Sequence, residues 1–333
     1  MSNEGINPFE RVSYIALTLD PVHVGTGEFR LGRVDNAIVR EAGTNLPKIP
    51  GSSLAGVARA YTAMSASPQK YLYAKNGSAV SCAGKGGEDG TEHCGGKDCP
   101  VCIGFGFSKK KESFQGLVQF SDLRILFYPI RSCLGPVWIT SPLALTDAGV
   151  SGHDDKGWKT WFQESGGNSE TAVSVAATAA GVRLNFGWLY MKLAAKSASL
   201  GILLGAATKN LPQLGLSELD GRIHVVPDEL FPLLVEDHLE VRTSVSISPK
   251  TGAAAEGALF TFEAIPRATV LYWHATYLNP ELFRLPGGGE TEFTLSGAKA
   301  LRPHVERGLE YTEYLGIGGS NTRGMGRMRI VKA

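Results

Sequence analysis

The sequence predicts an α+β fold that contains more strand than helix. Arg11–Asp20 alternates between apolar and polar side chains, as a half-buried strand does. In Ser52–Met64, apolar side chains recur at helical spacing, which indicates a helix with one buried face. Two further alternating segments lie within Glu240–Glu263. Together these segments indicate a chain built mainly of strands, with a few helices.

The N-terminal part of the chain is expected to run from strand through loop to helix. The first strand ends at Pro21, and a glycine-containing turn, His23–Gly27, follows it. A loop then leads to the helix, which we expect Ser52 to cap, with Arg59 on a face other than the apolar one. The later elements expected, in chain order, are strands near Leu117–Phe120 and Arg124–Tyr128, a short helix near Trp158–Glu164, an apolar run at Trp188–Leu193, a strand at Thr269–Tyr277, a helix at Ser296–Arg307 and a strand at Met325–Val331.

Residues 240–264 predict a protruding β-hairpin. Two alternating strands flank a long tip that contains Pro249 and Gly252, residues that favour turns. The chain has no internal repeat, no low-complexity linker and no clear domain boundary. We therefore expect a single domain over residues 1–333.

The composition is that of an ordinary globular protein. Of 333 residues, 43% are hydrophobic and 20% are charged, and the formal net charge is only +1. A surface that binds nucleic acid must therefore arise from local clustering of basic side chains. The chain has no basic N-terminal region followed by an apolar run and no stretch of about 18 consecutive apolar residues. We expect a cytoplasmic protein that does not contact a membrane.

Four of the five cysteines lie close together in the sequence. Cys82, Cys94, Cys99 and Cys102 follow the spacing Cys-x11-Cys-x4-Cys-x2-Cys, and His93 precedes the second of them. This pattern predicts a closed, structural Zn²⁺ site with these four cysteines as ligands, and His93 is the candidate substitute for one of them. The alternative is a cluster of reduced thiols without metal. The fifth, Cys133, lies in an apolar run and is expected to be a small buried hydrophobic residue.

The segment of residues 314–333 has the composition of a phosphate-binding loop. It contains five glycines, three arginines and one lysine, and it contains no acidic residue. Glycine lets backbone N–H groups approach an anion, and arginine adds charged hydrogen bonds. The spacing matches neither a P-loop nor a dinucleotide fingerprint, which favours a polynucleotide backbone as the ligand. The alternative is a glycine-rich hairpin with a solvated basic strand.

Few residues carry recognisable catalytic chemistry. The chain has no Gly-x-Ser-x-Gly motif and no His-x-x-x-His pair. Asp35 is flanked in sequence by Arg33, Arg40 and Lys48, and the helix N-terminus at Ser52 offers a further anion site. A carboxylate among phosphate-binding groups can bind a divalent ion or transfer a proton. The alternative reading of Asp35 is a turn-capping residue.

Taken in order, several short motifs resemble a known family. They are His23–Gly27, Val34–Arg40, Pro47–Gly56, Phe127–Arg131 with Pro136–Pro142, Lys250–Gly252 with Glu256–Phe260, and Gly316–Gly326. The chain resembles, along nearly its whole length, a backbone subunit of type III CRISPR effector complexes in the RAMP superfamily, nearest the Cmr type. The cysteine segment departs from that type and is more similar to the zinc-bearing modules of type III-D and III-E relatives.

The resemblance implies a fold and a set of partners. It implies a modified ferredoxin-like, RNA-recognition-type palm with an antiparallel sheet, a zinc-binding insertion at residues 79–113, a thumb hairpin at residues 240–264 and a glycine-rich loop at residues 314–327. The palm would bind a guide CRISPR RNA, and copies of the chain would stack along it as a filament with other type III effector subunits. Each thumb would insert into the duplex of guide and target RNA.

The resemblance also implies an activity. The target-cleaving aspartate of the family corresponds to Asp35, and the reaction is an endoribonuclease cleavage that requires a divalent cation such as Mg²⁺ and uses the 2′-hydroxyl of the RNA as nucleophile. The implied RNA-binding residues are His23, Arg40, Lys48, Ser52, Ser53, Arg59, Arg242, Gly318, Gly319, Thr322 and Arg323. Two alternatives remain open, a filament subunit that binds without cleaving and a guide-processing endoribonuclease of the same superfamily. A generic zinc-ribbon protein would explain the cysteines alone.

Overall fold

The structure, a computed structural model, divides into two compact units, each formed by separate parts of the chain. The first unit comprises Met1–Tyr14, Pro50–Asp122 and Trp273–Leu315, and the second comprises Ile15–Ile49, Leu123–Tyr272 and Gly316–Ala333. The residues that the structure describes are 7–27, 34–68, 82–84, 93–109, 112–150, 157–174, 182–194, 222–253, 259–284, 295 and 299–332. Among them, no helix is both long and apolar enough to cross a membrane.

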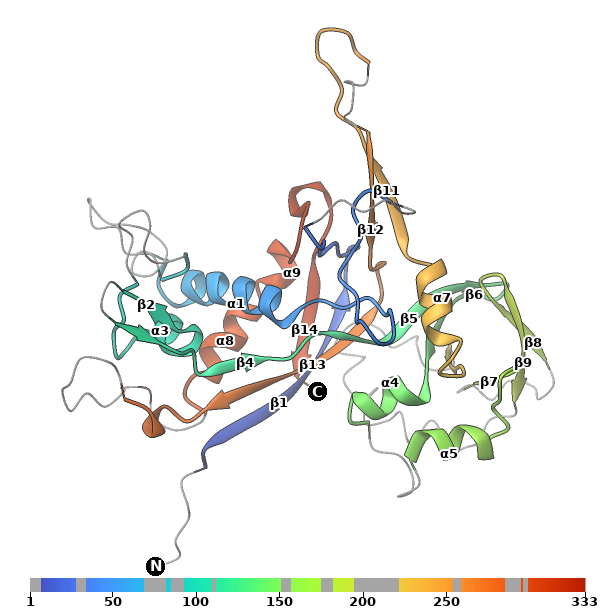
Figure 1. The fold of residues 1–333 in the computed structure, drawn as a ribbon, viewed down its shortest axis with the longest axis horizontal. Coiled ribbons are helices and arrows are strands. Elements are labelled where there is room, and N and C mark those ends of the chain that lie inside the picture. The colour runs from blue at the N-terminus through green and yellow to red at the C-terminus, as the bar shows by residue number, and fades with distance from the viewer. Residues whose placement is uncertain are drawn as a thin grey trace, which may run out of the picture. The chain divides into compact units, whose positions relative to one another are not determined.

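The first unit is built around helix α1, Gly51–Ala66, which packs against α8, Arg302–Leu309, and α3, Pro100–Phe105 (Figure 1). The close approach of α1 and α8 depends on Gly308, because a Cβ atom there would lie 2.6 Å from Thr62 Oγ1. The remaining elements of this unit are β2, Phe107–Ser108, β3, Ser113–Phe114, β4, Val118–Phe120, a 3-10 turn at Pro280–Leu282, and α9, Thr312–Leu315.

Helix α1 has the predicted buried face but a different N-terminus. Leu54, Ala58 and Thr62 are buried at helical spacing. The N-cap is Pro50 rather than Ser52, and no side chain of the cap residue bonds to the helix. Instead, the Gly51 N–H donates a hydrogen bond of 2.8 Å to Asp122 Oδ1. The expected Ser52 cap is therefore wrong, because a carboxylate distant in sequence already satisfies the first helical N–H.

The second unit contains most of a large mixed β-sheet. The strand order is β14-β1-β13-β5-β6-β10-β7-β9-β8, and β4 pairs with β13 off this order. Strands β1 and β13 enter this unit with residues 15–18 and 270–272. The strands are β14, Met328–Lys332, β1, Phe9–Thr18, β13, Val270–Leu278, β5, Arg124–Ser132, β6, Gly135–Thr140, β10, Ile223–Val225, β7, Thr171–Ser174, β9, Leu189–Ala194, and β8, Arg183–Phe186.

The sheet is not purely antiparallel, which corrects the predicted fold class. Strand β10 runs parallel to β6, and β9 runs parallel to β7, whereas β5 pairs antiparallel with β6 and with β13. Parallel neighbours require a crossover of the chain. Between β6 and β10 the described residues form helices and three other strands, so no tight turn imposes antiparallel pairing on β6 and β10.

The described part of the second unit contains three short helices, namely α4, Pro142–Asp147, α5, Gly157–Glu164, and α7, Phe231–Asp237. Helix α4 packs against α5 and β5. Trp158 and Phe162 lie one helical turn apart on α5, and both are buried in a core with Phe127 and Val225 of the sheet. Ile15 and Leu17 of β1 belong to the same core, which fixes the strand that precedes the loop containing His23 and Asp35.

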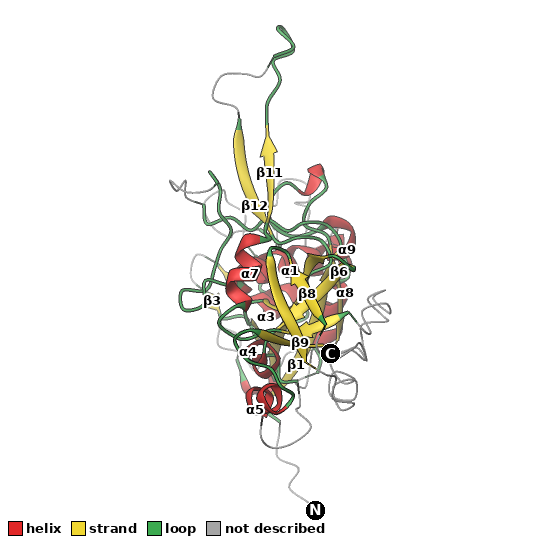
Figure 2. Ribbon diagram, turned by 90° about the vertical axis from the view of Figure 1, so that its right-hand side faces the viewer, coloured by secondary structure: helices red, strands yellow, loops and turns green. Residues whose placement is uncertain are grey.

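The predicted hairpin segment forms strands β11, Glu240–Ser244, and β12, Phe260–Ala264, which pair antiparallel with Arg242 opposite Phe262. Figures 1 and 2 show that the two strands extend away from the rest of the second unit. Val241 and Leu259 are exposed there. Part of the expected tip, including Glu256, lies outside the described residues.

Cys133 is exposed, so its predicted burial is wrong. Strand β5 ends at Ser132, and Cys133 lies in the turn that leads to β6. Its N–H donates a hydrogen bond of 2.7 Å to Asn185 Oδ1. The apolar run therefore predicted a strand correctly but not the position of the turn that ends it.

Candidate nucleic-acid interface and metal centre

Asp35 lies beside the base of the hairpin in the second unit. Its Oδ2 accepts hydrogen bonds from the backbone N–H of Thr261, at 2.7 Å, and from the Thr261 hydroxyl, at 2.9 Å. These bonds, the backbone one foremost, lower the pKa of the exposed Asp35 carboxyl below its usual value. The site therefore presents an ionised carboxylate to solvent at neutral pH.

Backbone hydrogen bonds fix the Asp35 loop on β12. The Asn36 N–H donates to Thr261 O at 3.1 Å, and the Glu263 N–H donates to Asn36 O at 3.1 Å. Asn36 thus forms a parallel bridge with Phe262. Asp35 consequently has a defined position relative to the hairpin strands.

His23 joins the same strand to the glycine-rich loop. Its Nδ1 lies 2.6 Å from Glu263 O, and because a carbonyl only accepts, Nδ1 carries the proton and donates it. The ring also packs edge-on against Phe262, with centroids 5.4 Å apart. The His23 carbonyl in turn accepts a hydrogen bond of 2.9 Å from the Gly319 N–H.

A positive φ and close backbone packing both favour glycine in the glycine-rich loop. Gly318 has φ of +82°, and a Cβ atom there would lie 2.2 Å from the carbonyl oxygen of His23. Gly326 has φ of +90° and accepts a hydrogen bond of 2.9 Å from the Ile317 N–H. The loop contains a short 3-10 turn, Asn321–Arg323, in which Thr322 and Arg323 are exposed. Its exposed apex carries backbone groups and one guanidinium, which suits a phosphate backbone.

Two of the expected RNA-binding arginines form ion pairs within the second unit. Arg40 pairs with Glu236 and, at 2.7 Å, with Glu263, whose side chain is only 4% exposed. Arg242 pairs with Glu240 at 2.6 Å. Arg323 Nη1, by contrast, donates at 3.5 Å to the hydroxyl of Ser244, a neutral group. Arg40 would thus have to leave two carboxylates to bind phosphate, whereas Arg323 would not leave any.

In the first unit, the expected anion site at the start of α1 is partly occupied by protein. Ser52 is exposed and Ser53 is partly exposed. The Asp122 carboxylate accepts the Gly51 N–H in the first turn, so its negative charge lies where a phosphate was expected. Lys48, another of the expected RNA-binding residues, belongs to the second unit. Its backbone N–H donates to Val39 O at 3.0 Å.

The four clustered cysteines converge in the first unit. The Sγ atoms of Cys82, Cys94, Cys99 and Cys102 all lie within 4.8 Å of one another. Cys94 Sγ and Cys102 Sγ are 3.7 Å apart. Ligands at Zn–S distances of about 2.3 Å in a tetrahedron stand roughly 3.8 Å apart, so the cluster has the dimensions of a tetrathiolate zinc site.

Backbone N–H groups support these sulfurs as thiolate ligands. Cys99 Sγ accepts from the Cys102 N–H at 3.4 Å, which caps α3. Cys94 Sγ accepts from the Gly96 N–H at 3.4 Å. Such bonds favour the charged form of sulfur that binds metal.

His93 and Arg59 surround the cysteine cluster without joining it. The His93 Nδ1 accepts from the Ser108 N–H at 3.0 Å, and its Nε2 donates to Gly84 O at 2.8 Å. Both ring nitrogens are therefore used, and His93 is not available as a substitute ligand. Arg59 donates to the carbonyl oxygens of Cys82, at 2.6 Å, and Phe105, at 3.0 Å.

Sequence reasoning missed two residues on which the Asp35 site depends. Thr261 holds Asp35, and Glu263 contacts both Arg40 and His23. Both residues lie on β12. Thr261 is 226 residues from Asp35 in the sequence. Their only sequence signal was an alternating strand pattern, which does not identify partners.

The comparisons with known proteins extend over most of the chain. The family model of the RAMP superfamily matches residues 16–329. The CRISPR system Cmr endoribonuclease Cmr4 of Pyrococcus furiosus is 28% identical over 260 residues, which cover 77% of each chain. The crystal structure of oligomeric Cmr4 from Pyrococcus furiosus superposes with a TM-score of 0.55 at 20% identity, with 98% of this chain and 99% of that one covered. A type III-B Cmr-beta complex bound to cognate target RNA includes a chain with a TM-score of 0.62 at 13% identity, with 98% of each chain covered.

Proposed function

The chain belongs to the RAMP superfamily, and from this premise we propose that it is a backbone subunit of a type III CRISPR effector complex of the Cmr type, which binds guide RNA and cleaves target RNA. The similar curated protein is named an endoribonuclease, and the similar complex was solved with cognate target RNA. The single observation that carries the proposal is the ionised, exposed Asp35 held at the base of the β11–β12 hairpin.

We assign the RNA-binding surface to the part of the second unit around β12. The backbone of the glycine-rich loop, Arg323 and Thr322 would contact guide phosphates, with His23 below the loop. Arg242 and Lys48 of the second unit are further candidates for this role. Ser52 and Ser53 would be separate phosphate contacts on the first unit. The ferredoxin-like palm would carry this surface, and the β11–β12 hairpin would be the thumb, whose exposed Val241 and Leu259 can pack against bases.

The reaction needs no nucleophile from the protein. The 2′-hydroxyl of the target RNA attacks the adjacent phosphorus, the bond from phosphorus to the 5′-oxygen breaks, and the products are a 2′,3′-cyclic phosphate and a 5′-hydroxyl. A divalent cation such as Mg²⁺, held by the Asp35 carboxylate, would supply Lewis-acid stabilisation of the phosphate charge. The hydrogen bonds from Thr261 would keep that carboxylate ionised and oriented.

We further propose that Cys82, Cys94, Cys99 and Cys102 hold a structural Zn²⁺. The site would be closed, since four thiolates fill a tetrahedral shell. Its role would be to order the surrounding polar loops, with Arg59 balancing the negative charge of the thiolates. Partners would be guide RNA, target RNA, further copies of this chain and other effector subunits.

The test is cleavage by the assembled complex with Asp35→Asn, which removes the charge and keeps the size. Guide loading and target binding should be retained, while cleavage at regularly spaced positions should be lost. Glu229→Gln, an exposed carboxylate of the same unit, is the matched control. Normal cleavage by the Asp35→Asn complex would reject the catalytic assignment.

One observation favours a second function, that of a subunit that binds RNA without cleaving it. Thr261 donates both of its hydrogen bonds to Asp35, so this carboxylate can serve simply to fasten its loop to β12. In that case the wild-type complex would bind target and leave it intact with divalent cations present. Loss of loop order, rather than loss of chemistry, would then follow from replacing Asp35.

A further inference from the structure

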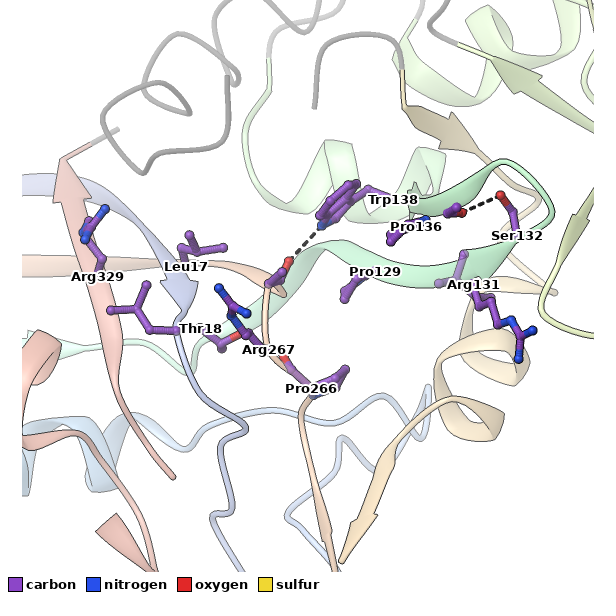
Figure 3. Close-up of a pocket in the computed structure, with 14 residues that line it drawn as sticks. Leu17, Thr18, Pro129, Arg131, Ser132, Pro136, Trp138, Pro266, Arg267 and Arg329 are labelled. Carbon is purple, nitrogen blue, oxygen red and sulfur yellow. Dashed lines mark hydrogen bonds between the residues drawn. The ribbon is translucent and has the colours of Figure 1, made fainter. Parts of the chain in front are cut away.

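A cavity of about 860 Å³ opens in the second unit, and it includes none of the residues of the proposed guide-binding surface (Figure 3). It lies where β1, β5, β6 and β14 meet the turn between β12 and β13. Its volume is within the range of about 300–1,000 Å³ that is usual for small-ligand sites. The lining residues used below are Trp138, Pro129, Pro136, Arg131, Arg267 and Arg329.

The walls of the cavity are largely apolar and rigid. Pro129 lies opposite Trp138 in the β5–β6 pair, so a proline ring and an indole come from adjacent strands. The indole N–H of Trp138 donates to Ala268 O at 2.8 Å, which satisfies its only polar group and fixes the plane of the ring. Figure 3 shows this bond from β6 to the turn between β12 and β13. The cavity therefore contains an aromatic surface whose orientation is set before any ligand binds.

The charged groups of the cavity all have the same sign. Arg131 comes from β5, Arg267 from the turn after β12 and Arg329 from β14 (Figure 3). None of the described residues that line the cavity is acidic. The nearby Asp20 interacts with Arg267 electrostatically, but its carboxylate is bound by Arg327 at 3.0 Å. Figure 3 shows Arg329 and Arg131 on opposite sides of the cavity with Arg267 between them, so in a chain of net charge +1 these arginines spread a local positive potential along one apolar cavity.

We propose that this cavity binds one nucleotide unit of RNA, with the base on the surface formed by Trp138 and the prolines and the phosphate on the arginines. A nucleotide combines a flat aromatic ring with an anionic group, and stacking on aromatic side chains with arginine contacts to phosphate is how proteins hold single-stranded RNA. An acidic peptide would match the arginines but would leave the flat surface of Trp138 without a comparable partner. The contact is additional to the proposed guide surface and can fail independently of it.

The cavity and the Asp35 site are connected by one strand. Thr261 and Arg267 are six positions apart in the sequence. At no more than roughly 3.6 Å per residue, their Cα atoms are at most about 22 Å apart. A single RNA strand a few nucleotides long can therefore reach from one site to the other.

The probe is a short oligouridylate that contains 4-thiouridine, cross-linked by light to the purified full chain and mapped by mass spectrometry. Adducts on Trp138 or on peptides that line the cavity are the expected result. Competition with uridine monophosphate distinguishes a free nucleotide from a segment of an RNA strand as the ligand of the cavity. Loss of these adducts indicates that a free nucleotide suffices, and their persistence indicates that a segment of a strand is needed.

The double variant Arg131→Ala and Arg267→Ala tests the charge contribution. Both side chains are exposed, so the fold should be retained, and the cavity adducts should fall about tenfold or more, as expected for loss of charged hydrogen bonds. Arg307→Ala, an exposed arginine of α8, is the control. Guide loading of the complex should remain unchanged, which separates this site from the proposed function.

Three results would overturn the proposal. The first is a map in which every adduct lies in the glycine-rich loop or the β11–β12 hairpin. The second is an unchanged level of cavity adducts in the double variant. The third is displacement of the probe from the cavity by polyglutamate but not by unlabelled oligouridylate, which would assign the cavity to an acidic protein segment.

Discussion

At the scale of single residues, the behaviour of Asp35 depends on Thr261. Both hydrogen bonds from Thr261 favour the charged carboxylate, so the pKa of Asp35 lies below the usual value of about 3.9. A lowered pKa means that the ionised form persists as the pH falls and is lost only below the usual range. Activity that requires this charge should accordingly survive mild acid.

The change Thr261→Val tests this dependence, because it removes the hydroxyl donor and keeps the backbone N–H. The pKa of Asp35 should rise toward its usual value, and the acid limb of the cleavage profile should move to higher pH. Less firm positioning should also slow cleavage at neutral pH by up to about tenfold. Rates measured across the pH range on the assembled complex give both effects.

Thr243→Val is the matched control, since Thr243 is exposed and pairs with Thr261 across the hairpin. It should leave the profile unchanged. An acid limb that stays in place in Thr261→Val would show that the ionisation of Asp35 does not limit cleavage.

Arg59 is the second residue for which the structure changes the expectation. We predict that Arg59→Ala lowers zinc retention instead of guide affinity, because it leaves the carbonyls of Cys82 and Phe105 without their donors. Each unsatisfied group costs about 1–3 kcal/mol. The measurement is the rate of zinc release to a colorimetric chelator, with Arg307→Ala as the control. Normal zinc retention with weakened RNA binding would restore the original expectation of a phosphate contact.

At the scale of elements, the glycine-rich loop at residues 314–327 is shaped by its backbone conformation. Its contact with the His23 carbonyl positions the loop beside the base of the hairpin. Arg323 then reaches Ser244 on β11. The proposed RNA-binding surface thus depends on two loops and one strand that meet at His23, and a change in the loop backbone should disturb the whole surface.

We predict that Gly318→Ala strongly weakens guide binding. Its Cβ would lie 2.2 Å from His23 O, so the loop must move, and the left-handed φ adds a strain of about 1–2 kcal/mol. Gly324→Ala is the matched control, because Gly324 has φ of +74° but no atom within 4 Å of the added Cβ. Affinities for guide RNA at several salt concentrations should therefore fall far more for Gly318→Ala. Equal losses in the two variants would show that strain alone, without the clash, matters.

At the scale of the whole molecule, the proposal implies a repeating array of equal sites. Each copy of the chain along the guide would contribute its own Asp35 and its own hairpin. Complexes assembled from mixtures of wild-type and Asp35→Asn chains should therefore lose cleavage at each position in proportion to the variant fraction. Gel analysis of the individual cleavage products measures this, with mixtures that contain Glu229→Gln as the control. Loss of all cuts at a low variant fraction would mean that copies share one active centre.

Patterns that are local in the sequence determined much of the architecture. The helix at residues 51–66, the first strand and the paired strands β11 and β12 were predictable because side-chain periodicity reflects burial within one element. The cysteine cluster was predictable because its four members lie within 21 residues of sequence. The glycine-rich loop was recognisable because glycine composition reports directly on backbone conformation.

Only the tertiary structure decided which side chains meet. Thr261 donates to Asp35, Arg40 pairs with Glu263, Arg59 donates to the carbonyl of Cys82, and Cys133 is exposed. The tertiary structure also made β10 parallel to β6, which a count of strands does not indicate. The physical reason is that periodicity reports whether a residue is buried, whereas its partner is set by packing between segments that can lie more than 200 residues apart.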